Sequence, residues 1–113
     1  MDLEELRRLV HARWNWTKEG YPNLKETGPM AKAAHLQTHL SSTVGKLASY
    51  IGRHHHGLGL TEPNKMRQVA TVLCANLVLD ALELANIFEV KTEDLIQVIE
   101  HAQHERSRPN STA

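Results

Sequence analysis

The chain has 113 residues, and its 13 Lys and Arg balance its 13 Asp and Glu, so the formal net charge is zero at pH 7. A neutral protein has no overall field that draws it to DNA, RNA or an anionic membrane, so this composition argues against a nucleic-acid partner. The length suits one small domain, and because such a domain buries only a modest share of its surface when alone, association with further copies is expected.

The most apolar stretch, residues 69–88, predicts a core helix rather than a membrane span, because polar side chains interrupt it. Those side chains are Thr71, Asn76, Asp80, Glu83 and Asn86. The acidic first five residues do not resemble a signal peptide, and the lone Cys74 has no internal disulfide partner. We therefore expect a cytoplasmic protein with no membrane contact.

In chain order, the first predicted helix spans about residues 3–14, where Asp2 and Glu5 have the spacing of a capping box. A loop rich in Gly and Pro follows, and the second helix is predicted to begin near Pro29 and to fray across residues 52–59. Its predicted apolar face comprises Leu36, Leu40, Val44, Leu47 and Ile51.

The third predicted helix runs from about Thr61–Pro63 to about Phe88, and apolar residues cover most of its circumference. Thr92 is expected to cap a fourth helix that ends near residue 106. Its inward-facing residues are predicted to be Leu95, Val98, Ile99 and Ala102.

No period-two pattern competes with these helices, so the sequence predicts an all-α fold, with one domain over residues 1–106 and a flexible tail over 107–113. A third helix so widely apolar needs more cover than the second helix and the two short helices, the first and the fourth, give. We therefore expect an oligomeric helical bundle, as a homo-dimer or homo-tetramer.

Two polar stripes stand out against the apolar pattern at helical spacing. One lies on the second predicted helix and one on the third, and together they are His35, His39, Ser42, Thr43, Lys46, Asn76, Asp80 and Glu83. If the stripes face each other they line a ligand-binding cleft. If they face solvent or a wet subunit interface, they have no chemical role, and the spacing alone leaves both interpretations open.

The histidine and aromatic residues also have both a functional and a structural interpretation. His35 and His39, four residues apart, could bind zinc as a minor possibility, whereas His54–His56 fits an exposed loop. Trp14, Trp16 and Tyr21 could stack on a nucleobase or pack over the end of the bundle.

Residues 40–51, Leu-Ser-Ser-Thr-Val-Gly-Lys-Leu-Ala-Ser-Tyr-Ile, resemble the helix of MazG-type nucleotide pyrophosphohydrolases that reads Leu-x-Glu-Glu-Val-Gly-Glu-Leu-Ala-Glu-Ala-Ile. Residues 73–76, 84–86 and 91–95 are similar to that family's later segments at the same spacing. The resemblance implies an all-α dimer or tetramer with a nucleotide pocket between the second and third helices.

In that family the acidic positions hold magnesium, which activates water for attack between the α and β phosphates. In this chain the corresponding positions are Ser42, Thr43, Lys46, Leu73 and Asn76. Since a lysine and a leucine cannot bind a divalent cation, the resemblance implies that the magnesium site is lost. We expect Lys46 to take its place by pairing with Asp80 or Glu83.

The leading functional hypothesis is a non-catalytic MazG-like homo-oligomer whose cleft binds a nucleotide or another small anion, or serves as an interaction surface. One alternative is a nucleoside triphosphate pyrophosphohydrolase with rearranged metal ligands such as Asp80 and Glu83, or a histidine-metal hydrolase. The other alternative is a purely structural oligomer.

Overall fold

The computed structural model describes residues 1–14, 16–17, 19–22, 24, 28–57 and 62–107, and within these ranges it contains helices and no strand. The helices are α1 (Leu3–Trp14), α2 (Pro29–His55), α3 (Pro63–Ile87) and α4 (Thr92–Ser107). The predicted all-α class and the predicted order of four helices are confirmed. Positions 58–59 of the predicted frayed end of the second helix, position 61 at the predicted start of the third, and positions 108–113 of the predicted tail lie outside the described residues.

Side-chain and proline signals set the helix starts. The Asp2 carboxylate accepts the Glu5 N–H at 2.8 Å, which is one half of the predicted capping box. Pro29 and Pro63 stand at the first positions of α2 and α3, where a missing N–H costs nothing. At α3 the Glu62 carboxylate also accepts the N–H groups of Asn64 and Lys65, both at 2.9 Å.

Some predicted helix boundaries need correction. α2 continues through Gly52 as far as His55, and α4 includes Ser107, the first residue of the predicted tail. Thr92 is the first residue of α4, and its hydroxyl accepts a hydrogen bond from Arg7 and donates one to Glu4. Its side chain therefore fastens α4 to α1 instead of capping its own helix.

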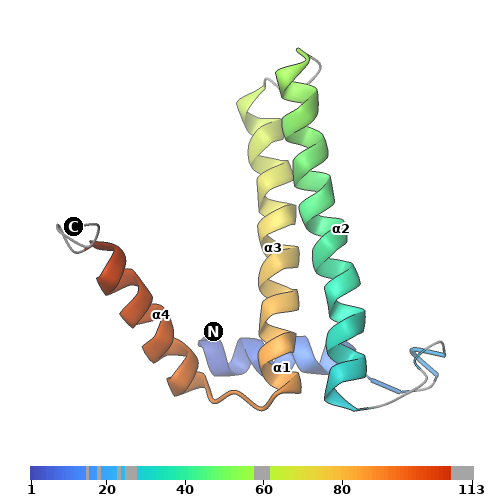
Figure 1. Cartoon of the computed structure of the whole chain (residues 1–113), viewed down its shortest axis with the longest axis vertical. Coiled ribbons are helices and arrows are strands. Elements are labelled where there is room, and N and C mark those ends of the chain that lie inside the picture. Colours follow the sequence, from blue (N-terminus) through green and yellow to red (C-terminus); the bar gives the residue numbers. More distant parts are fainter. Residues whose placement is uncertain (15, 18, 23, 25–27, 58–61, 108–113) are drawn as a thin grey trace.

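α2 and α3 form a long antiparallel hairpin, α1 crosses the base of this hairpin, and α4 runs away from it (Figure 1). The core lies at the crossing, where Val10 and Trp14 of α1 meet Leu36 of α2 and Leu82 of α3. Leu36 has no exposed surface and Val10 has 2%. The base of the hairpin is therefore the packed part of the chain.

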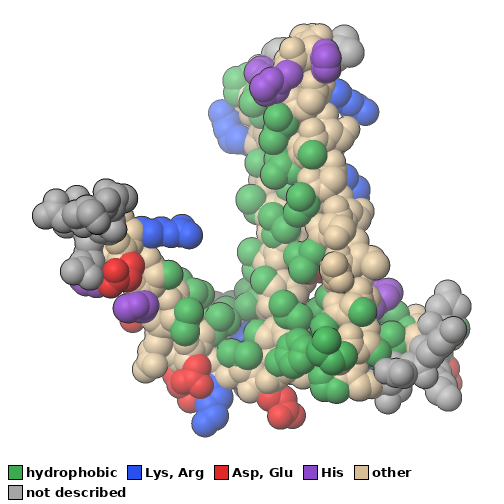
Figure 2. Space-filling model, in the orientation of Figure 1, with side chains coloured by type: hydrophobic (Ala, Val, Ile, Leu, Met, Phe, Trp, Pro, Cys, Tyr) green, Lys and Arg blue, Asp and Glu red, His purple; other side chains and the backbone are tan. Residues whose placement is uncertain are grey.

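The rest of the hairpin is open in the single chain. Val44, Leu47 and Ile51, which were predicted to face inward, are 55%, 44% and 50% exposed, because α1 covers only the base and α4 points elsewhere. A column of apolar side chains follows the hairpin toward its far end (Figure 2). The radius of gyration is 17.6 Å, whereas a compact domain of this size has about 13 Å.

α3 is long and apolar enough to cross a membrane by length and composition. Core helices of soluble proteins meet the same criteria, and α3 carries the buried carboxyl groups of Asp80 and Glu83. The expected lack of membrane contact therefore stays a prediction.

Candidate functional site

A polar cavity of about 260 Å³ lies between α2, α3 and the end of α1. Its lining residues are Arg13, Trp14, Tyr21, His39, Ser42, Thr43, Lys46, Asn76, Leu79 and Asp80. The list contains six of the eight residues of the two predicted stripes. Six residues from the stripes of α2 and α3 thus line a common cavity near the base of the hairpin, and ligand binding there stays a prediction.

Asp80 is the buried acid of this cavity. Its side chain is 5% exposed, and it makes no hydrogen bond or ion pair with another described residue. Burial raises its pKa, and the nearby charges of His39 and Arg13 only partly offset that effect. The carboxyl group therefore keeps its full capacity to bond a ligand.

Trp14 lines the same cavity and has a second unpaired group. The residue is 8% exposed, and its indole N–H has no hydrogen-bond partner among the described residues. The ring is held by its neighbours, with Trp16 stacked at 5.3 Å and His39 edge-on at 5.0 Å between ring centroids. Buried polar groups normally have a partner. The Trp14 N–H is closed off from solvent, so the Asp80 carboxyl is the unpaired group that this cavity offers to a bound molecule.

Lys46 does not make the predicted ion pair. It is exposed, and within the part of the chain that the structure describes it pairs with neither Asp80 nor Glu83. It lines the cavity together with the exposed Arg13 from the end of α1, a residue that the stripes did not include. The cavity therefore carries two cationic side chains that no described carboxylate neutralises by direct contact.

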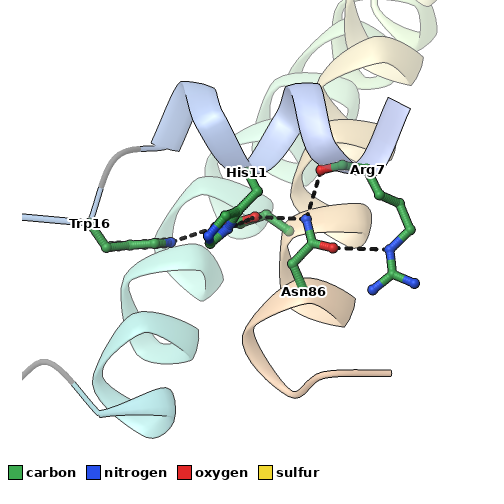
Figure 3. Close-up of polar contacts among 5 residues, drawn as sticks. Arg7, His11, Trp16 and Asn86 are labelled. Carbon is green, nitrogen blue, oxygen red and sulfur yellow. Dashed lines mark hydrogen bonds and ion pairs between the residues drawn. The ribbon is translucent and has the colours of Figure 1, made fainter. Parts of the chain in front are cut away.

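Glu83 belongs to a different site from Asp80. It has no exposed surface, and three side chains bond its carboxylate. The His11 Nδ1 atom lies 3.1 Å from each oxygen, the Trp16 indole N–H donates at 2.5 Å and the Asn86 amide donates at 3.0 Å (Figure 3). The carboxylate is thus a structural bond between α1 and α3, which does not favour a joint Asp80 and Glu83 metal site.

Asn86 and Arg7 extend this bond along α1. The Arg7 Nε–H donates to the Asn86 side-chain oxygen at 2.9 Å, and the Asn86 amide donates to the Arg7 backbone carbonyl at 3.1 Å (Figure 3). Sequence reasoning missed Arg7 and His11, although two polar residues four apart within an amphipathic helix are a usable signal.

His35 lies beside the cavity and is not part of its lining. Its Nε2 atom is 3.0 Å from that of His39, and burial together with the neighbouring His39 lowers its pKa, which favours the neutral imidazole. The described residues contain no group of three or more His, Cys, Asp or Glu arranged to hold a metal ion. Zinc at His35 and His39 therefore stays a prediction.

The rings of the aromatic cluster stack on one another. Trp16 lies between Trp14 at 5.3 Å and Tyr21 at 4.7 Å, with both ring pairs stacked. These contacts agree with the packing interpretation, because the faces that a nucleobase would need are occupied by neighbouring rings.

No protein-family model, curated protein or solved structure matches this chain.

Proposed function

We propose that the protein is a non-catalytic, MazG-like helical homo-oligomer whose cleft between α2 and α3 binds a small anionic ligand. The observation that carries the proposal is the cavity itself, where Arg13 and Lys46 lie beside the unpaired, buried carboxyl group of Asp80. The resemblance to the MazG-type helix supports the same location, since that family binds its nucleotide between the corresponding helices.

The charged residues of the cavity suit a ligand that has an anionic group at one end and a hydrogen-bond donor at the other. Arginine and lysine are the side chains that bind phosphate and carboxylate groups, arginine through paired N–H donors and lysine as a point charge. Asp80, opposite in sign, suits a hydrogen-bond donor on the same ligand. A nucleotide offers both ends, and the volume of about 260 Å³ suits a ligand of nucleoside size or smaller.

The absence of catalysis is inferred from the chemistry of the lining. Ser42 and Thr43 offer neutral hydroxyl groups and Asn76 offers an amide, whereas Lys46 brings a positive charge into the place where the family needs acids. Divalent magnesium prefers carboxylate and phosphate oxygens. The lining therefore favours binding of the anion over metal-assisted hydrolysis.

The test is a thermal-shift panel with inorganic phosphate, pyrophosphate and nucleoside mono- and triphosphates. A ligand that binds only the folded state stabilises it by about 2.7 kcal/mol at one hundred times its Kd. We expect at least one of these anions to raise the Tm, and Lys46→Met or Arg13→Met to reduce that rise. Lys65→Met is the matched control, because Lys65 lies in the first turn of α3, outside the cavity.

Two results would replace the proposal. A panel in which no anion changes the Tm would remove the binding role and leave a structural oligomer. Magnesium-dependent release of pyrophosphate from a nucleoside triphosphate, lost in Asp80→Ala, would show an enzyme with rearranged ligands.

A further inference from the structure

The arm α4 leaves much of its apolar face exposed in the single chain. Thr92 bonds it to α1, and Leu95 packs against the core at the crossing. Beyond this first turn, Ile96, Val98 and Ile99 are 39%, 66% and 54% exposed. An amphipathic helix with an open apolar face has a surface to cover.

A matching apolar groove of about 280 Å³ lies toward the far end of the hairpin. It is lined by Leu47, Tyr50, Ile51, His54, Met66, Val69, Ala70 and Leu73, from both α2 and α3. Ile51 and Met66 are about half exposed in the single chain. Groove and arm thus have the same apolar chemistry, and the arm leaves from the base of the hairpin whereas the groove lies toward its far end (Figure 1).

The charges of the two elements are complementary. Beside the groove, α2 carries Arg53 and no carboxylate, and the first turns of α3 add Lys65 and Arg67. α4 carries four carboxylates against one arginine, and these are Glu93, Asp94, Glu100, Glu105 and Arg106. Opposite charges around apolar faces favour and orient their contact.

The apolar part of the arm does not reach the groove of its own chain. From Leu73 to the end of α3 the helix rises about 21 Å, whereas Ile99 lies only about 11 Å along α4 from its first residue. The connector between the two helices, Phe88–Lys91, is held against α3 by the Glu89 N–H to Asn86 carbonyl bond and the Val90 N–H to Ala85 carbonyl bond, at 3.1 and 2.9 Å.

We propose that the occupant of this groove is α4 of a second copy, in a two-fold dimer whose hairpins run antiparallel. In that arrangement the base of one hairpin, where its α4 begins, meets the far end of the other, and each copy gives one arm and receives one. This inference rests on the homo-oligomer of the proposed function and assigns its interface.

Mixed cross-linking tests the assignment with full-length chains. In a Cys74→Ser background, one batch carries Val98→Cys and the other Met66→Cys, and the two are mixed, re-equilibrated and oxidised. We expect disulfide-linked dimers that contain one chain of each kind, in a yield about tenfold above that of a Gln97→Cys control, because a disulfide requires close Cα atoms. The pair Ile99→Cys and Ile51→Cys repeats the test, and circular dichroism confirms the helical fold of every variant.

Each other outcome overturns the inference in a distinct way. A chain that carries both Val98→Cys and Met66→Cys and closes a disulfide within one monomer shows that the arm covers its own hairpin. Light scattering that finds a dimer, without either cross-link, shows that the copies meet through another face. A monomer at all concentrations removes the dimer altogether, while the thermal-shift panel still reports independently on the cleft.

Discussion

Trp14 and Trp16 lie two residues apart and stack on each other, but only the indole N–H of Trp16 has a partner, the buried Glu83 carboxylate. Replacement by phenylalanine removes the same atoms from both. We expect Trp16→Phe to lower the free energy of unfolding by about 1–3 kcal/mol more than Trp14→Phe, because it leaves a buried charged acceptor short of a donor. Urea denaturation without added ligand measures the difference.

When ligand is added, we expect Trp14→Phe to have the larger effect of the two variants on the ligand-induced change in Tm. Trp14→Phe changes a ring that lines the cavity and should reduce the anion-induced rise in Tm, whereas Trp16 is not part of the lining and Trp16→Phe should leave that rise largely unchanged. Equal destabilisation by both changes would contradict the bond between Trp16 and Glu83.

Asp80 predicts a pH dependence of stability with a definite sign. Because burial raises its pKa above the ordinary 3.8, the unfolded state loses this proton more readily than the folded state, and ionisation of Asp80 opposes folding as the pH rises. Asp80→Asn should therefore raise the Tm at pH 7, and its advantage should shrink as the pH falls toward 3.8.

Thermal unfolding followed by circular dichroism over this pH range measures the effect. The control is Glu19→Gln, which changes an exposed carboxyl group in the loop before α2. If Asp80→Asn raised the Tm by the same amount at every pH in this range, the raised pKa of Asp80 would have no effect on stability.

The polar lining of the cavity could be predicted from the sequence because residues three, four and seven apart share one face of a helix. Ser42 with Lys46 and Asn76 with Asp80 follow that rule, and one hairpin brings the two faces together. Arg13 and the partners of Glu83 could not be found in this way, because they come from α1. Their position depends on how α1 crosses the hairpin, which periodicity within one helix does not encode.

At the scale of elements, the end of α3 is a complete Schellman motif. The Val90 N–H bonds to the Ala85 carbonyl and the Glu89 N–H to the Asn86 carbonyl, and Glu89 takes the left-handed conformation with φ 54°. Glycine usually fills this position, because a side chain there costs about 1–2 kcal/mol.

Glu89→Gly should consequently stabilise the protein by about 1 kcal/mol, since it removes the strained Cβ while the cap stays intact. Glu89→Ala is the matched control, because it removes the carboxylate and keeps the Cβ. Urea unfolding midpoints compare the two, and an alanine variant as stable as the glycine variant would refute the explanation.

The starts of α2 and α3 were predictable because proline marks each of them. The course of α4 was not, since the sequence shows an amphipathic helix without showing which surface it covers. The predicted inward face of Val98 and Ile99 is open in the single chain for that reason.

At the scale of the whole molecule, the core gathers at one crossing and leaves most of the hairpin uncovered, which a chain of this length seldom tolerates alone. If copies associate as proposed, mass action makes the Tm rise with protein concentration. We expect this rise from low to high micromolar concentration for the natural sequence and a much smaller one for Val98→Glu, which places a charge on the arm. A Tm independent of concentration would argue for a monomer.

The short connector Phe88–Lys91 has a consequence for how such an assembly could be switched. A dimer in which each copy gives its α4 to the other is a domain swap. Whether α4 binds the groove of its own chain or that of the second copy depends on whether the connector is long enough to let it reach its own groove. Insertion of about eight Gly and Ser residues after Val90 adds roughly 16 Å of reach, which exceeds the shortfall of about 10 Å along the hairpin. Because tripling a flexible loop costs only about 1 kcal/mol, the lengthened chain should become a compact monomer by small-angle scattering, its own α4 filling the groove. The same contacts would then hold one chain instead of two, and loop length alone would set the number of subunits.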